Sequence, residues 1–382
     1  MTFVSFEWLA WMGAVTLLFW MVPERFRLRF LIAASILFLA VKDPLSCAIL
    51  AALTATTHLL TNRPEFRGSQ AVVAVLPVAA ILLAYKLWSA ASGDDLLTST
   101  IIPLGLSYYA LRCIHYVLER YKGNIDSRPF LDLISYLFFL PTIYIGPIHR
   151  FAQFDRDARR HRWDAAVFSE GLERILYGYV KIVVLGNFLV SQAFADWSAS
   201  VATDASPAGL YLRMTEIGLN LYFQFSGFSD ISIGFARLLG FRVMENFNWP
   251  FFQKNLSEFW RCWHISLTSW CREYVYASVI AHTRSPALGA LATLIVIALW
   301  HEVSIRYLIW GFYHGLGIIA WQQSQKLWSG RPPIQSLALR RSLDFLSILL
   351  TLHYVWLGFL LVRQPDLNSM AAVLHTLFLG WI

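Results

Sequence analysis

The sequence places a histidine and a glutamate side by side at the end of an apolar run. Residues 294–304 read LIVIALWHEVS, so Trp300, His301 and Glu302 directly follow six apolar residues. Ionisable groups at membrane depth are costly, and they usually face the interior of a helix bundle or a water path. The alternative is a helix that ends among lipid headgroups, where His301 is simply wet. The HExxH pattern of zinc proteases is excluded because Ile305 stands where its second histidine is required.

A second histidine lies in the stretch 255–276, which reads NLSEFWRCWHISLTSWCREYVY. Aromatic residues recur there at helical spacing, and they predict that Trp260, Trp263 and His264 share one face of a helix. Asn255, followed three residues later by a glutamate, resembles a capping box, so this helix is expected to begin there. Such a helix suits either the membrane interface or the lining of a polar cavity. Alternatively, His264 is a buried side chain that is hydrogen-bonded to a neighbouring helix.

The composition indicates which kind of fold must position these residues. Of the 382 residues, 57% are hydrophobic and only 14% are charged, and the mean hydropathy is +0.52. A soluble domain is about 25% charged. Apolar runs close to the ~20 residues needed to span a bilayer recur along the whole chain, for example at 9–22, 45–60, 71–87 and 343–361. The sequence predicts an all-α polytopic membrane protein with about ten transmembrane helices.

The positions of arginine and lysine predict the orientation of the chain. Basic linkers at 25–29, 63–67 and 120–128 are expected to be cytoplasmic, which places the N-terminus outside. The loop 149–162 carries five arginines and is expected on the same face, although only one apolar stretch, 130–147, precedes it. That stretch is therefore predicted to enter and leave on one face as a re-entrant segment. Such backbone needs protein or water around it, so an internal cavity is expected there.

Several classes of protein and site are disfavoured. The four cysteines are scattered without a C-x-x-C pair, which indicates neither a disulfide framework nor a zinc site. The net charge of +7 is spread over short loops instead of one stripe, which argues against a nucleic-acid partner. No cluster of metal ligands is present, so no metal is expected. No linker divides the chain, and 1–382 is predicted to be a single integral-membrane domain.

Several blocks of the sequence resemble the membrane-bound O-acyltransferase family. The resemblance is greatest to its bacterial branch, which includes the D-alanyl transferase of teichoic acid modification and the alginate O-acetylation protein. It covers about residues 100–320. Three central blocks carry it, namely YFQFSGFSDISIGFARLLGFRVMENFNWPF (222–251), FWRCWHISLTSWCREYVY (259–276) and ALWHEVSIRYLIWGFYHG (298–315). Two weaker blocks lie upstream, at 102–123 and 141–151.

The resemblance implies roles for individual residues. His301 is implied to be the catalytic histidine and His264 the second family histidine, within helices arranged around a central tunnel. The side chains implied to shape this tunnel are Asn255, Trp260, Arg261, Trp263, Trp300, Glu302 and His314, although His314 could instead pack between helices. The family usually has glycine after the catalytic histidine, where this chain has Glu302. The carboxylate either reaches the imidazole of His301 and orients it or lies solvated at headgroup level.

The resemblance also implies a reaction and its partners. An acetyl or D-alanyl group would pass from a cytoplasmic thioester to a hydroxyl of an extracytoplasmic polysaccharide, or to a periplasmic partner protein that completes the transfer. A neutral imidazole at His301 would act as general base, which contributes about 10²–10⁴-fold. The donor is expected to be acyl-CoA or an acyl-phosphopantetheine carrier protein, and no cofactor is expected to bind tightly. The implied location is the bacterial cytoplasmic (inner) membrane.

Two further hypotheses remain open from the sequence. The five arginines of the loop 149–162 could attract an acidic carrier protein or the phosphates of coenzyme A, although most such runs only enforce topology. In a different class of function, the chain could be a transporter or translocation partner in which His301 and Glu302 relay protons. Transporters of that kind have inverted repeats with paired broken helices, and a broken helix is indicated only once here, which favours the enzyme.

Overall fold

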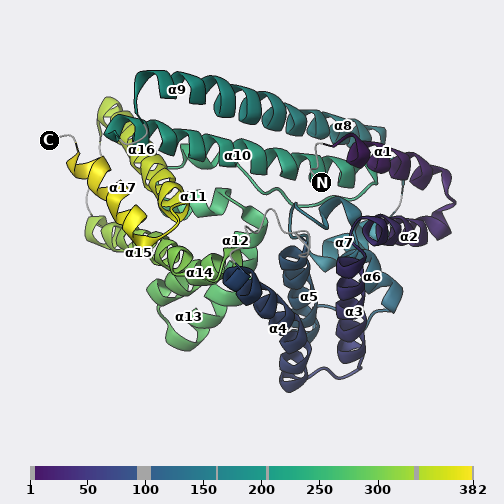
Figure 1. Ribbon diagram of the computed structural model, residues 1–382. Coiled ribbons are helices and arrows are strands. Elements are labelled where there is room, and N and C mark those ends of the chain that lie inside the picture. Colours follow the sequence, from purple (N-terminus) through teal and green to yellow (C-terminus); the bar gives the residue numbers. More distant parts are fainter. Residues whose placement is uncertain (1–4, 93–104, 161, 204–205, 331–334, 381–382) are drawn as a thin grey trace. The chain divides into compact units, whose positions relative to one another are not determined.

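The computed structural model describes residues 5–92, 105–160, 162–203, 206–330 and 335–380 (Figure 1). Regular structure in this part is helical throughout, and the described residues contain no named β-strand. The predicted all-α fold class is therefore confirmed. The chain forms two compact units. The first comprises residues 1–179 and 227–245, and the second comprises 180–226 and 246–382. The single domain that the sequence predicts stays a prediction.

Four helices of the described part are long and apolar enough to cross a membrane, by length and composition. They are Pro44–Thr61, Gly68–Trp88, Ala165–Val201 and Leu337–Val362. Three shorter apolar helices are Phe6–Met21, Pro286–His301 and Leu367–Leu379. These helices agree with a polytopic membrane protein. The number of about ten spans, the central tunnel and the external N-terminus stay predictions.

The first unit consists of the N-terminal helices and the C-terminal part of a long helix, α10. Its elements are α1 (Phe6–Met21), α2 (Glu24–Lys42), α3 (Pro44–Thr61), α4 (Gly68–Ser92), α5 (Leu106–Tyr121), α6 (Phe130–Leu137), the 3₁₀-helix η1 (Leu140–Thr142), α7 (Phe151–Ala158), α8 (Ala165–Tyr179) and part of α10 (Pro207–Leu238).

Helices α8 and α10 approach closely in the first unit because glycines face each other there. A Cβ at Gly171 would lie 2.9 Å from the carbonyl oxygen of Gly234, and one at Gly234 would lie 2.7 Å from that of Gly171. Small residues at such crossings let helix backbones approach closely in membranes. An ion pair of 2.6 Å between Arg174 and Asp230 joins the same two helices. The middle of α8 is thereby fixed against the C-terminal part of α10.

The stretch 130–147 does not form one spanning helix. Helix α6 has eight residues and η1 has three, and the chain is non-helical from Ile143 until α7 begins at Phe151. Eight residues rise only about 12 Å, far less than the ~30 Å of a bilayer core. The stretch is therefore not one membrane-spanning helix, and its re-entrant course stays a prediction. The face on which it enters and leaves, and the cavity expected beside it, stay predictions.

The second unit carries both histidines of interest. Its elements are the π-helix η2 (Val180–Phe194), α9 (Ala195–Val201), the first part of α10, the 3₁₀-helix η3 (Pro250–Phe252), α11 (Leu256–Cys262), α12 (Ile265–Cys271), the π-helix η4 (Arg272–Tyr276), α13 (Ala277–Thr283), α14 (Pro286–His301), α15 (Ile305–Trp328), α16 (Leu337–Val362) and α17 (Leu367–Leu379).

The single helix predicted over 255–276 is wrong, because the chain breaks at Trp263 and His264. Trp263 is extended, with φ −104° and ψ 127°, and His264 is left-handed, with φ 45° and ψ 53°. Asn246 competes for the helical hydrogen bonds. Its carbonyl oxygen accepts from Ile265 N at 2.9 Å, and its side-chain oxygen accepts from Ser266 N at 3.2 Å and Oγ at 2.6 Å. Helix α11 therefore ends at Cys262, and α12 starts afresh.

The predicted break at the HEVSIR segment is confirmed. Helix α14 ends at His301, and Glu302 is extended, with φ −155° and ψ 140°. Ser304 then caps α15, because its side chain accepts from Tyr307 N at 3.4 Å. The two adjacent helices pack closely (Figure 1). A Cβ at Gly311 would lie 2.9 Å from the Cβ of Ala298, so the absence of a side chain there brings α15 against the last turns of α14.

Candidate active site

His264 and His301 lie in one cluster of aromatic rings, which we call the imidazole cage and define as His264, Trp300, His301, Tyr307 and Trp310. Ring centroids of Trp300 lie 5.7 Å from His264 and 4.8 Å from His301. On its other side His301 stacks on Tyr307, with centroids 5.6 Å apart and an interplanar angle of 22°, and meets Trp310 edge-on at 6.0 Å. Residues 37 positions apart are thereby brought together.

The two imidazoles of the cage differ in how much solvent they meet. His264 is buried, at 2% exposure, and its ring also meets Phe225 of α10 at 4.7 Å. His301 is half-buried at the end of α14. His301 is therefore the imidazole that an incoming molecule can reach, while His264 lies behind it.

A second layer of rings continues from Trp310. Trp260 meets Trp310 at 5.6 Å and His314 at 5.2 Å, and Trp310 meets His314 at 4.7 Å. His314 is fully buried, and a Cβ at Gly358 would lie 2.7 Å from its Nε2. His314, a residue of α15, thus packs against α16. This position agrees with the interpretation from the sequence in which His314 packs between helices. Its ring supports Trp310 from behind and does not belong to the cage itself.

Glu302 takes neither of the two positions considered from the sequence. Its Oε1 and Oε2 accept hydrogen bonds from Nη2 of Arg306, at 2.9 and 3.1 Å. Nη1 of the same guanidinium donates to the carbonyl oxygen of Gln364 at 2.9 Å. Glu302 therefore fastens the start of α15 to the chain that follows α16. Both carboxylate oxygens are committed to Arg306 and not to the ring of His301.

The remaining predicted residues shape the surroundings of the cage. Asn255 caps α11 as expected, because its Oδ1 accepts from Glu258 N at 2.9 Å. Trp263 is turned toward other aromatic rings and stacks on Phe259 at 5.5 Å. Arg261 and Trp260 line a cavity of about 180 Å³ between α11, α12, α14 and α15.

Sequence reasoning missed Tyr307, Trp310 and Phe225 as ring partners of the two histidines. A signal was present for the first two. They follow His301 by six and nine residues, just after the predicted break, so a helix that restarts there brings them back toward the end of α14. Phe225 carries no such signal, because its contact with His264 depends on the packing of α10 against distant segments of the chain.

The cage can support proton transfer in a setting from which water is largely excluded. A half-buried neutral imidazole with fixed ring neighbours can accept a proton from a hydroxyl that reaches it. Aromatic walls lower the local dielectric and strengthen the interactions inside. In the described part of the chain, no group of three or more His, Cys, Asp or Glu side chains is placed to hold a metal ion.

Comparisons with known proteins identify the family of the chain. A probable alginate O-acetylase of Pseudomonas fluorescens is 30% identical over 311 residues, which are 78% of this chain and 61% of that protein. A teichoic acid D-alanyltransferase of Bacillus subtilis is 26% identical over 67% of each chain. A peptidoglycan O-acetyltransferase of Helicobacter pylori is 26% identical over 72% of this chain and 56% of that one. The model of the membrane-bound O-acyltransferase family matches residues 10–361, and the chain belongs to that family.

Proposed function

We propose that the chain is a membrane-bound O-acyltransferase with His301 as its general base. It transfers an acyl group, acetyl or D-alanyl, from a thioester donor on the cytoplasmic side of the bacterial inner membrane. The acceptor is a hydroxyl of an extracytoplasmic polysaccharide or of a partner protein that completes the transfer. The proposal extends the family membership of the chain to a reaction, a direction and a base.

The observation that carries the proposal is the position of His301. The helix break after α14 presents its imidazole at the end of an apolar helix, half-buried and flanked by Trp300, Tyr307 and Trp310. A purely structural histidine would be expected to be enclosed as His314 is. Instead, His301 combines a fixed ring orientation with access for another molecule, which is the combination a general base needs.

The chemistry balances with the residues of the cage. The acceptor hydroxyl gives its proton to the neutral imidazole of His301 as its oxygen attacks the thioester carbonyl carbon. The C–S bond of the resulting tetrahedral intermediate then breaks, and the thiolate takes the proton from the imidazolium. His264, the second imidazole of the cage, is buried and supports His301 through the Trp300 ring that both imidazoles contact.

The comparisons support the acceptor class. The three relatives are named for alginate, teichoic acid and peptidoglycan, which are all polymers outside the cytoplasm. This chain spans 61% of the length of the alginate O-acetylase. We assign the shared acyl transfer to this chain without choosing between the three polymers or between acetyl and D-alanyl.

The structure favours this reaction over a transporter with a His301–Glu302 proton relay. Such a relay requires the carboxylate to exchange protons with the imidazole. Both carboxylate oxygens of Glu302 instead accept hydrogen bonds from Arg306, so neither is directed at the imidazole of His301. Glu302 is better suited to fixing the helix break that positions His301.

The test is the ester content of surface and secreted polysaccharide from cells that express the wild type, His301→Ala or His301→Gln at equal membrane levels. We expect base-labile acyl esters with the wild type and their loss with both variants, and mass spectrometry of the released acid identifies the acyl group. Esters that persist at wild-type levels with both variants would overturn the role of His301. Wild-type cells without any added ester would overturn the acyltransferase itself.

A further inference from the structure

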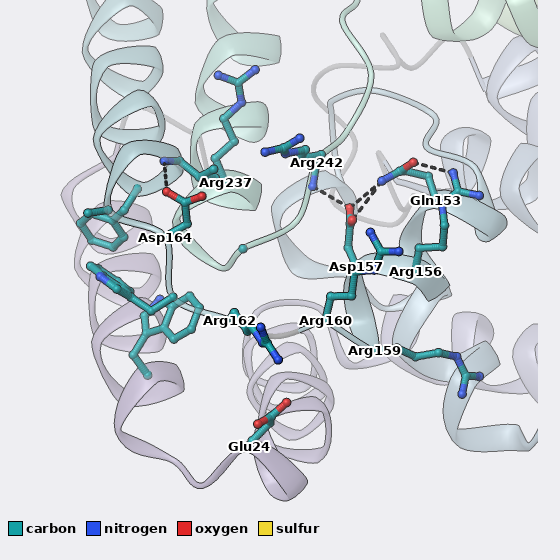
Figure 2. A pocket seen from close by; sticks show the side chains of 16 residues that line it. Glu24, Gln153, Arg156, Asp157, Arg159, Arg160, Arg162, Asp164, Arg237 and Arg242 are labelled. Carbon is teal, nitrogen blue, oxygen red and sulfur yellow. Dashed lines mark hydrogen bonds between the residues drawn. The ribbon is translucent and has the colours of Figure 1, made fainter.

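The first unit contains a large cavity whose lining does not include His301. We call it the arginine pocket. Its volume is about 1080 Å³, and it lies between the end of α1, α7, the connection to α8 and the segment that ends α10 (Figure 2). Six arginines line it, against three carboxylates from Glu24, Asp157 and Asp164. The arginines are Arg156, Arg159, Arg160, Arg162, Arg237 and Arg242.

The wall of the arginine pocket is held together by Asp157. Its carboxylate accepts hydrogen bonds from Gln153 Nε2 at 2.9 Å and from the backbone N of Arg242 at 2.9 Å (Figure 2). Gln153 in turn accepts from Nη2 of Arg156 at 2.6 Å. These bonds join α7 to the segment after α10. The arginines therefore stand on a connected framework, and the pocket is built from parts of the chain that are far apart in sequence.

Four of the six arginines form no ion pair with a described residue, and of these Arg156 donates to the neutral side chain of Gln153. Arg159 pairs with Asp155 at 3.0 Å, and Arg237 pairs with Glu170 at 2.9 Å. The exposed guanidinium groups of Arg160, Arg162 and Arg242 form no ion pair with any residue that the structure describes. Like charges that share one concave surface repel each other and create a positive potential there. A polyanion that fits the cavity relieves this repulsion.

Aromatic side chains accompany the charges. Trp163 is 52% exposed in the same cavity. Its ring is supported by Phe168 at 4.6 Å and by Trp20 at 5.1 Å, edge-on. Guanidinium groups bind phosphate through paired hydrogen bonds, and an exposed aromatic face stacks on a planar base. The volume is at the upper end of the roughly 300–1,000 Å³ of small-molecule sites, which suits a nucleotide better than a single phosphate.

We propose that the arginine pocket binds the nucleoside phosphate portion of a coenzyme A thioester. The phosphates pair with Arg160, Arg162 and Arg242, and the base stacks on Trp163. This inference rests on the proposed function, because it assigns a place to the donor of that reaction and selects coenzyme A over a carrier protein. The phosphate of an anionic lipid headgroup has the same charge but no base, so the aromatic wall distinguishes the two ligands.

The experiment measures equilibrium binding of radiolabelled coenzyme A to the full-length protein in detergent. Arg160→Gln/Arg162→Gln removes two uncompensated charges of the pocket. Arg63→Gln/Arg67→Gln is the matched control, because it removes two exposed arginines of the same unit outside the pocket. We expect Kd to rise by roughly tenfold or more in the pocket variant, since hydrogen bonds to charged groups are the strong ones, and by less than about twofold in the control.

Competing ligands identify which part of the molecule is recognised. We expect adenosine 3′,5′-diphosphate to displace coenzyme A, and pantetheine, which lacks the nucleotide, to displace it weakly. Trp163→Ala should weaken binding of coenzyme A and of adenosine diphosphate while leaving inorganic phosphate unaffected. Unchanged coenzyme A binding in the arginine variant overturns the proposal. So does displacement by phosphatidylglycerol nanodiscs that is equally strong in the wild type and Trp163→Ala, since a lipid headgroup is then the ligand.

The outcome is separable from that of the proposed function. His301→Ala should bind coenzyme A like the wild type, because His301 is not part of the arginine pocket. Suppose that ester formation requires His301 but the Kd for coenzyme A is unchanged in Arg160→Gln/Arg162→Gln. In that case only the pocket assignment fails. If the arginine variant loses binding while no cell expressing the wild type forms esters, the pocket stands and the acyltransferase proposal fails.

Discussion

The imidazole cage and the arginine pocket differ in the charge and the exposure of the side chains that form them. The cage is built from two imidazoles and the aromatic rings of Trp300, Tyr307 and Trp310, with His264 only 2% exposed. The arginine pocket presents exposed guanidinium groups, of which Arg160, Arg162 and Arg242 lack an ion-pair partner in the described part of the chain. An apolar, enclosed site disfavours charge, whereas exposed like charges attract an anion over a distance. The cage is therefore suited to the chemical step, and the arginine pocket is suited to binding an anionic ligand.

The largest expected effect belongs to the cage. His301→Ala should lower the rate of ester formation by about 10²–10⁴-fold, because it removes the general base. Purified protein and a thioester donor with a soluble glycan acceptor give the rate directly, and coenzyme A binding serves as the folding control. A loss of less than about threefold would contradict the assignment of His301 as general base. The cage would then no longer be the site of the chemical step.

A higher salt concentration should weaken donor binding at the arginine pocket and leave the chemical step at the cage unchanged. Raising the salt from about 0.1 M to about 1 M shortens the Debye length from about 10 Å to about 3 Å, so we expect KM for an acyl-coenzyme A donor to rise roughly tenfold. Because the cage contains no arginine, lysine or carboxylate side chain, kcat should change by less than about twofold. An acyl-pantetheine donor is the control, since it lacks the nucleotide. An equal salt effect on both donors would contradict the division of roles.

The helix break beside His264 should depend on Asn246. Asn246→Ala removes the acceptor of the bonds from Ser266 N and Oγ, and we expect a loss of stability of about 2 kcal/mol, because a buried donor is left unsatisfied. Thermal unfolding in detergent measures the change, and ester formation should fall with it. Asn246→Asp keeps an acceptor oxygen and is the matched control. Equal midpoints for the alanine variant and the wild type would show that another contact holds the break.

The smallest effect is expected at Glu302. Glu302→Gln retains an oxygen that can accept from Arg306, and a partly exposed ion pair contributes only about 0–1 kcal/mol, so ester formation should stay within about threefold of the wild type. Kinetics at matched protein levels check this. A drop comparable to that of His301→Ala would mean that the carboxylate acts on the imidazole during the reaction, and the cage would then no longer be a site of neutral groups alone.

Local features of the sequence predicted much of this architecture. The apolar runs indicated a helical membrane protein, the HEVSIR segment indicated the break between α14 and α15, and Asn255 indicated the start of α11. Each of these signals lies within a few residues of the structure it specifies.

Features that depend on distant contacts were not predictable in the same way. The break at Trp263 and His264 arises because Asn246, some eighteen residues upstream, takes over the first hydrogen bonds of α12. Helical periodicity alone argued for continuity there. Likewise, the five arginines of the loop 149–162 suggested an anionic partner, but the contribution of Arg242 depends on Asp157, which is 85 residues away.

The left-handed backbone of His264 has a consequence for protein engineering. A residue with a side chain pays a steric penalty of about 1–2 kcal/mol in that conformation, whereas glycine adopts it freely. His264→Gly would relieve this strain, but it would also delete a ring that is 2% exposed and packs against Phe225 and Trp300. The cavity left behind costs about 2–5 kcal/mol, which is more than the strain that is relieved. The usual stabilising exchange of a left-handed residue for glycine is therefore expected to fail at this position, and a search for thermostable variants should keep a full-sized side chain there.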